Sequence, residues 1–192
     1  MRKITLSAVA AAAAFVAMPA AAQDTAPDGS RAFGIDPYVA VLGGWEQFDN
    51  EPNDAGIPPA TSGRLDGSLI QGIVGFNVPL GPVFIGAEGN ATKGISGDID
   101  WEYGVAGRAG VRAGESGLIY GKVGYQWVNF AAFGKDSPDY HAMTYGLGFE
   151  VGPKDIGLSG LTGNAGIRFR GEVTTFGDAQ SLRPMAGLVA HF

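Results

Sequence analysis

The sequence predicts an all-β fold, an eight-stranded antiparallel transmembrane β-barrel, on three observations. Glycine makes up 32 of the 192 residues and is spread along the chain, which disfavours helices because an interior glycine costs about 1 kcal/mol relative to alanine. No segment after residue 22 contains 18 uninterrupted apolar residues, so a helical membrane protein is excluded. Eight segments instead alternate apolar and polar residues, and most are about as long as a tilted strand that crosses a bilayer.

The composition limits the function classes. The chain contains no cysteine, which excludes disulfides, thiolate metal sites and thiol catalysis. Its formal net charge is −6, and this acidic balance argues against nucleic acid as a partner, because phosphate binding needs a basic surface. Hydrophobic residues make up 45% of the chain, more than a disordered protein carries. The length fits one domain.

The first 22 residues have the pattern of a secretory signal peptide. Arg2 and Lys3 precede an apolar stretch over 6–18, and Ala20-Ala21-Ala22 supplies a small-residue cleavage site. The apolar stretch is shorter than the ~20 residues of a membrane-spanning helix. We therefore expect export and cleavage of 1–22, a short periplasmic segment over 23–37, and a barrel domain over 38–192.

The first four predicted strands are 38–46, 69–78, 83–92 and 101–113. Each is assigned because its apolar and polar residues fall on opposite faces, as successive side chains of a strand do. The apolar faces carry, in order, Val39, Val41 and Trp45; Ile70, Val74, Phe76 and Val78; Val83, Ile85 and Ala87; and Trp101, Tyr103, Val105 and Val111. The polar faces carry Tyr38 and Glu46; Gln71 and Asn77; Glu88 and Asn90; and Glu102, Arg108 and Arg112.

The last four predicted strands are 118–129, 142–151, 165–176 and 182–192. Their apolar faces carry Ile119, Val123, Tyr125 and Trp127; Met143, Tyr145, Leu147 and Phe149; Ile167, Phe169 and Val173; and Leu182, Leu188, Ala190 and Phe192. Their polar faces carry Tyr120, Lys122 and Gln126; Thr144 and Glu150; Arg168, Arg170 and Glu172; and Arg183 and His191. The charges of each strand therefore share one face.

Two architectures produce this alternation. A soluble, lipocalin-like barrel in the periplasm would turn its apolar face inward around a ligand, whereas a transmembrane barrel turns it toward lipid. With the mature N-terminus in the periplasm, all three tryptophans reach the same extracellular interface. An aromatic girdle is typical of a bilayer boundary, and it would comprise Trp45, Trp101, Tyr103, Tyr125 and Trp127. The transmembrane barrel is therefore favoured, and the soluble barrel is the alternative.

This topology defines the connections. The outer loops would be 47–68, 93–100, 130–141 and 177–181, and the periplasmic turns would be 79–82, 114–117 and 152–164. Long outer loops and short inner turns are typical of outer-membrane barrels. The last inner connection is longer than this rule predicts.

Charged residues on the polar faces form a nearly balanced set that we expect to point into the lumen. An eight-stranded barrel is only wide enough for side chains to fill it, and charges held there must pair. The set predicts either a salt-bridged plug or a gated polar pore; the balance of signs favours the plug, whereas inward glycines could leave water-filled gaps. The set is Glu46, Glu88, Glu102, Glu150, Glu172, Arg108, Arg112, Lys122, Arg168, Arg170 and Arg183.

The last strand alternates and ends in phenylalanine, with Leu188, Ala190 and Phe192 on one face. This ending resembles the assembly signal of bacterial outer-membrane proteins. Together with segments 38–44 and 167–172, it makes the mature chain similar to the small opacity-type or OmpA-like outer-membrane β-barrel family, although that family often has an aromatic residue where this chain has Ala190. The resemblance implies the outer membrane of a Gram-negative bacterium, with a structural or surface role or weak porin activity.

The same resemblance implies the partners: outer-membrane lipid, lipopolysaccharide, and the assembly machinery that reads the last strand. Loop 47–68 is the best candidate for a surface partner, since loops carry most of the variable function. Its acidic residues could hold Ca²⁺, but the sequence lacks an Asp-x-Asp-x-Asp-Gly loop, and a solvated surface is the simpler interpretation.

The sequence does not predict an enzyme. The remaining alternative is a lipid-modifying outer-membrane enzyme, similar to deacylases that have a His-Ser-acid site. His141 lacks the serine two residues later that this pattern needs. His191 would face inward at the periplasmic end, far from outer-leaflet lipid. No cofactor and no metal site is predicted, since two separate histidines do not make a transition-metal site.

Overall fold

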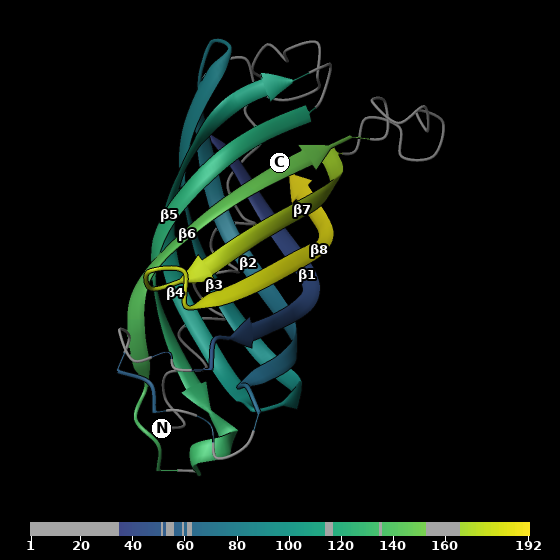
Figure 1. Ribbon diagram of the computed structural model, residues 1–192. Helices are drawn as coiled ribbons and strands as arrows, with labels where there is room; N and C mark the ends of the chain where they lie inside the picture. The colour runs from purple at the N-terminus through teal and green to yellow at the C-terminus, as the bar shows by residue number, and fades with distance from the viewer. Residues whose placement is uncertain are drawn as a thin grey trace.

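Eight strands of the described residues each pair with their neighbour in the sequence, and the last pairs with the first to close a barrel (Figure 1). The computed structural model describes residues 35–50, 52, 56–58, 60, 63–113, 117–134, 136–152 and 166–192. The strands are β1 (Asp36–Phe48), β2 (Asp66–Leu80), β3 (Val83–Gly97), β4 (Ile99–Ala113), β5 (Gly117–Phe130), β6 (Tyr140–Val151), β7 (Gly166–Phe176) and β8 (Ser181–His191). Every pairing is antiparallel.

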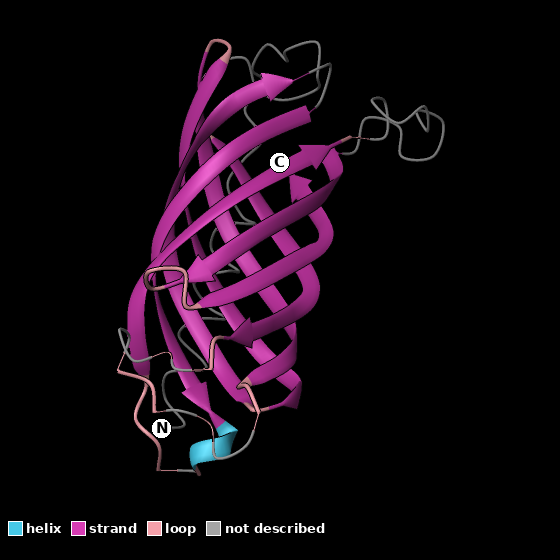
Figure 2. Ribbon diagram, in the orientation of Figure 1, coloured by secondary structure: helices cyan, strands magenta, loops and turns pink. Residues whose placement is uncertain are grey.

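The connections between strands define the two ends of the barrel. The end where β1 joins β2, β3 joins β4, β5 joins β6 and β7 joins β8 is called the outer end, and the opposite end is called the inner end. Strands form the wall, and the short 3-10 helix η2 (Ala131–Phe133) lies at the outer end (Figure 2). No helix of the described residues is long and apolar enough to span a membrane. The predicted signal peptide and most of segments 23–37 and 152–164 lie outside the described residues.

The facing of the strands distinguishes the two predicted architectures. On β6, Leu147 is 74% exposed on the outside, whereas Glu150 is 0% exposed on the inside. The same inversion holds on β4, where Val105 is 58% exposed and Arg108 is 3% exposed. An apolar exterior around a charged interior is the arrangement of a transmembrane barrel. The predicted fold class is therefore confirmed, and the soluble barrel with an apolar interior is wrong.

Most strands are longer than the alternation predicts, and the predicted outer loop 93–100 is wrong. Strand β3 continues to Gly97 and β4 begins at Ile99, so that Asp98 alone joins them. Gly97 has a φ of 92°, a conformation that glycine adopts without a steric penalty. The amide of Asp98 donates to the Asp66 carbonyl at 2.6 Å, which fixes this hairpin against the start of β2. The glycine and serine content of this segment is typical of a loop, but its backbone is a strand up to Gly97.

The other boundaries move by a few residues. The first outer connection is 49–65 rather than 47–68, the third is 131–139 rather than 130–141, and the last is 177–180 rather than 177–181. The first inner turn shortens to Gly81 and Pro82. Strand β1 begins at Asp36, inside the segment predicted to precede the barrel. These additional residues lengthen the wall without changing which face each side chain takes.

The barrel interior holds an apolar core beside its charges. Leu42 of β1, Ile73 of β2 and Met185 of β8 are buried there with aromatic residues of the outer end. Their backbones are adjacent, because Leu42 pairs with Gly187 and Ala40 pairs with Ile73. One side of the interior is therefore apolar, and the charged residues come mainly from the wall between β3 and β7.

The inward glycines lie where neighbouring strands and rings approach closely. A methyl group added at Gly148 would lie 2.4 Å from the Tyr120 ring, and one added at Gly75 would lie 2.5 Å from the Tyr38 ring. The predicted inward glycines are all similarly tight, with added atoms 2.0–2.8 Å from neighbouring atoms, at Gly104, Gly110, Gly124, Gly146, Gly148, Gly166 and Gly187. Glycine is needed at these positions because strands and tyrosine rings approach closely, and the space is occupied.

Candidate functional site in the barrel lumen

The predicted charges lie inside the barrel, and the structure divides ten of the eleven into two groups. Ten of the eleven are buried, and Arg112, near the inner end of β4, is half-buried. One group, here called the central network, joins Glu88, Arg108, Lys122, Glu150, Arg168, Arg170 and Glu172 with Asp36, Tyr38, Asn77, Tyr120 and His191. The other, here called the outer cluster, joins Glu46, Glu102 and Arg183 with Gln126 and Ser181.

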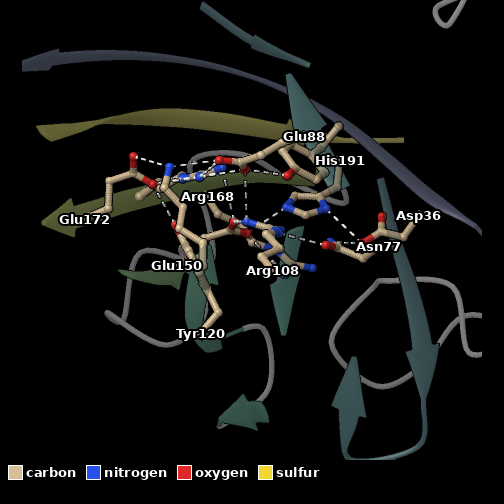
Figure 3. A network of polar contacts seen from close by, with 12 residues as sticks. Asp36, Asn77, Glu88, Arg108, Tyr120, Glu150, Arg168, Glu172 and His191 are labelled. Atoms are coloured by element: carbon tan, nitrogen blue, oxygen red, sulfur yellow. Dashed lines mark hydrogen bonds and ion pairs between the residues drawn. The ribbon is translucent and has the colours of Figure 1, made fainter. Parts of the chain in front are cut away.

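Glu88 of β3 is the most heavily paired carboxylate of the central network (Figure 3). The Lys122 ammonium donates to it at 2.9 Å, and Arg170 donates to both of its oxygens at 2.8 and 3.0 Å. The Tyr38 hydroxyl donates a further hydrogen bond at 2.7 Å. Lys122 and Arg170 also donate to Glu172, at 2.8 and 2.7 Å. Two carboxylates therefore share two cations, and the four side chains tie β3, β5 and β7 together across the lumen.

Glu150 of β6 organises the inner half of the network. Arg108 donates to one of its oxygens at 2.8 Å, and His191 Nε2 lies 2.8 Å from the other. His191 Nδ1 lies 3.0 Å from Asp36 Oδ2, which also accepts from Asn77 at 3.1 Å. These contacts connect the first and last strands to the middle of the barrel wall. His191 is therefore a buried member of this network.

The Arg108 guanidinium lies close to two tyrosine rings. Its carbon is 4.3 Å from the centroid of the Tyr38 ring and 4.7 Å from that of Tyr120. Cations within about 6 Å of an aromatic face are attracted by the ring quadrupole, and more strongly where water is excluded. The two tyrosine hydroxyls donate to Glu88 and Glu172, so each ring contacts a cation while its hydroxyl contacts an anion. Gly75 and Gly148 make room for these rings.

The outer cluster has a different balance of charge. Arg183 of β8 contacts both Glu102 and Glu46, at 3.5 Å for the latter. Glu102 also accepts from Gln126 at 2.7 Å, and Glu46 accepts from Ser181 at 2.6 Å. One cation therefore serves two buried carboxylates, whereas the central network has four carboxylates and four arginine or lysine side chains. Both groups connect strands on opposite sides of the lumen.

Three phenylalanines close the interior at the outer end. The Phe48 ring packs edge-on against Phe130 and Phe176, with centroids 5.1 and 5.7 Å apart. All three are buried, and Ile57 and Leu65 of the first outer connection pack against them. These five residues are called the aromatic cap. The sequence analysis does not predict the cap, although Phe130 and Phe176 follow the inward phase of their strands, because the alternation of a transmembrane barrel marks inward positions as polar.

The predicted girdle residues lie on the outward face near the outer end. Tyr103 stacks on Trp127 with centroids 5.3 Å apart, and Tyr125 packs edge-on against Trp127 at 4.9 Å. Trp101 lies under the Lys93 ammonium, which also pairs with Asp100. Trp45, on β1, lies apart from this group and is 36% exposed. The outward face thus carries one ion pair near its rim, which the shorter predicted strands did not include.

The predicted assembly-signal residues and His141 lie at opposite ends of the barrel. Leu188, Ala190 and Phe192 follow the outward face at the inner end of β8, with Leu188 and Phe192 more than half exposed. His141 lies at the outer rim, where its Nδ1 is 2.6 Å from the Tyr125 hydroxyl. Across the described part of the chain, no group of three or more histidine and acidic side chains is placed to hold a metal ion.

Comparison with known proteins gives structural likeness alone. No protein family and no curated protein sequence matches the chain. Among solved structures, Neisserial surface protein A has a TM-score of 0.50 at 10% identity, over 83% of this chain and 99% of that one. Ail, the attachment invasion locus protein of Yersinia pestis, has a TM-score of 0.48 at 13% identity, over 81% and 97%. A de novo designed transmembrane β-barrel has a TM-score of 0.48 at 12% identity, over 85% and 99%. At such identity the likeness to the Neisserial protein concerns the fold.

Proposed function

We propose that this protein is exported to the outer membrane of a Gram-negative bacterium, where it is a non-enzymatic barrel with a structural and surface role. The apolar exterior would contact membrane lipid and lipopolysaccharide, and the last strand would engage the assembly machinery. The first outer connection, within the predicted loop 47–68, would be the site for a surface partner. Weak porin activity, the other role suggested by the family resemblance, is here the alternative.

The observation that carries this proposal is the double closure of the lumen. The aromatic cap fills the outer end, and the central network crosses the middle with side chains that are bonded to one another. A pore needs a continuous polar path. An ion that passes between packed phenylalanine rings loses its hydration, and this has a high free-energy cost. A barrel closed at two levels supports a role at the surface rather than in transport.

Bilayer conductance tests the closure. The purified barrel is inserted into planar lipid bilayers, and we expect no resolved channel steps for the wild type. Replacing Phe48 and Phe176 by alanine removes two of the three phenylalanine rings of the cap, and Glu88→Ala with Lys122→Ala in the same chain removes an ion pair of the central network. This combined cap variant should produce channel events, whereas the two phenylalanine changes alone should not. The matched control is Phe149→Ala, because Phe149 is a phenylalanine of the same wall that faces outward and is 44% exposed. Stable channel steps from the wild type, unchanged in the cap variant, would instead support porin activity.

Cell fractionation tests the location separately. We expect the mature chain in the outer-membrane fraction, with a band whose mobility on SDS gels changes on boiling, since a closed barrel resists detergent until heated. A protein recovered from the soluble periplasmic fraction, with no change on boiling, would contradict the proposed location.

A further inference from the structure

The glycines of the barrel wall fall into two steric classes. Inward glycines are required, since an added methyl group at any of those discussed above would overlap a neighbour. Outward glycines differ: an added methyl group at Gly171 would lie 2.7 Å from the Phe149 ring, whereas it would lie 3.8 Å from its nearest neighbour at Gly89 and 3.9 Å at Gly107. A glycine inside a strand weakens it and often marks a close approach by a ligand or another chain. The packing within the barrel therefore gives no reason for glycine at these two positions.

Gly89 and Gly107 line a groove whose large apolar side chains belong to the outward face, and the inward-facing Tyr38 and Glu88 also line it. The groove has a volume of about 620 Å³ and crosses β2 to β6, within the range of roughly 300–1,000 Å³ of small-molecule sites. Val74 and Phe76 line it from β2, and Val123 and Met143 line it from β5 and β6. The strand register explains this shape, since Val74 pairs with Gly89 and Gly107 pairs with Val123. Large side chains thus flank small ones across neighbouring strands.

The outer edge of the groove carries hydrogen-bonding groups. Tyr125 lines the groove, and its hydroxyl lies 2.6 Å from His141 Nδ1. Two residues before Val105 on β4, Tyr103 donates to Asp139 at 2.8 Å. Tyrosine and tryptophan gather at the level of lipid headgroups, with their polar atoms toward water. The groove therefore begins just below the outer membrane interface and extends into the hydrocarbon region.

We propose that this groove is a binding site for one acyl chain of a lipid in the outer leaflet. The inference rests on the proposed membrane location, because the groove is continuous with the lipid-facing surface. The flanking side chains Val74, Phe76, Val105, Val123 and Met143 are apolar and offer contacts along a hydrocarbon chain. Beside the groove, Tyr125 and His141 offer a hydroxyl and an imidazole to the polar part of the same lipid. Gly89 and Gly107 let the chain lie against the backbone.

A second copy of the protein fits this surface poorly. In a twofold dimer the same patch meets itself, so two hollows would face each other and enclose a void. Packed interfaces lose dispersion contacts wherever such a void remains. The concave shape thus favours a thin, flexible acyl chain over a second, rigid copy of the barrel.

Native mass spectrometry tests the site. The full chain in mild detergent is incubated with dimyristoylphosphatidylcholine, and bound lipid is counted at collision energies that strip loosely held molecules. We expect the wild type to retain one lipid and Gly107→Leu to retain at least roughly tenfold less, a loss that corresponds to about 1.4 kcal/mol. Gly43→Leu is the matched control, because Gly43 is also outward and an added methyl group there has its nearest neighbour at 3.9 Å, as at Gly107.

Each result decides the proposal. Equal retention by the two variants, or a wild type that retains no lipid, would overturn it. A dimer whose signal falls in Gly107→Leu would overturn it in favour of self-association. The change of mobility on boiling shows whether each variant is folded, and Gly89→Leu replaces Gly107→Leu if that variant is not. A folded, membrane-located barrel without retained lipid refutes this site alone, whereas recovery in the soluble fraction refutes the proposed function.

Discussion

Replacing Glu88 by glutamine should strongly destabilise the barrel. Glu88 is 4% exposed and accepts hydrogen bonds from Lys122, Arg170 and Tyr38. Removing one partner of a buried ion pair leaves uncompensated charge, which costs about 3–5 kcal/mol. Here Lys122 and Arg170 lose the negative charge between them and one of its two acceptor oxygens, although both keep Glu172. We therefore expect a loss in the free energy of unfolding at the lower end of this range, about 3 kcal/mol.

Urea titration in lipid vesicles measures this loss. The folded fraction is read from the gel mobility of unboiled samples, and the free energy follows by linear extrapolation. Asp139→Asn is the control, since Asp139 is exposed and its loss should cost less than about 1 kcal/mol. Adding Lys122→Met to Glu88→Gln should recover part of the stability by restoring the balance of charge. A cost for Glu88→Gln no larger than that of Asp139→Asn would refute the reasoning.

Three further predictions use the same unfolding assay. Val105→Arg places a charge on the outward face and should cost about 2–4 kcal/mol; folding equal to wild type would contradict the assigned facing. Gly148→Ala should displace the Tyr120 ring, 2.4 Å from the added methyl group, and cost about 1–3 kcal/mol, whereas Gly121→Ala, with 3.8 Å available, should be within about 0.5 kcal/mol of wild type. Ala179→Gly should stabilise the β7–β8 turn by about 1 kcal/mol, because Ala179 has a φ of 64° and left-handed backbone penalises a side chain; an unchanged midpoint would argue against strain there.

The sequence predicts the fold well because the period of two depends only on whether each residue is apolar or polar. On β4 and β7, charges recur on one face only, which separates the two faces of the wall. The tryptophans at one interface then indicate that the charged face is the interior. The ends of strands are harder to predict, as 93–97 shows: Gly94, Ser96 and Gly97 have poor strand propensity, yet they lie in β3. Backbone pairing with the neighbouring strands keeps these residues extended despite their low strand propensity. The sequence of one segment does not show which strand will pair with it.

The site was predictable in its members but not in its partners. Alternation places Glu88, Glu102 and Arg183 inside, yet their separation into a central network and an outer cluster depends on the stagger between strands. The close packing at the inward glycines is hidden for a related reason, because the sequence does not show that the Tyr120 ring lies against Gly148 or the Tyr38 ring against Gly75. The aromatic cap shows that apolar residues in the inward phase carry information too.

Closure of the barrel joins its first and last strands, β1 and β8. Between β1 and β8 the backbone ladder lacks pairs at Trp45 and Glu46, opposite Pro184 and Arg183, and proline has no amide hydrogen to donate. Side chains clasp this seam instead, with Asp36 and His191 near the inner end and Glu46 and Ser181 near the outer end. A slip of β8 by one residue along β1 would turn His191 and Ser181 away from the lumen and break both pairs, so these side chains select the register in which β1 and β8 close the barrel.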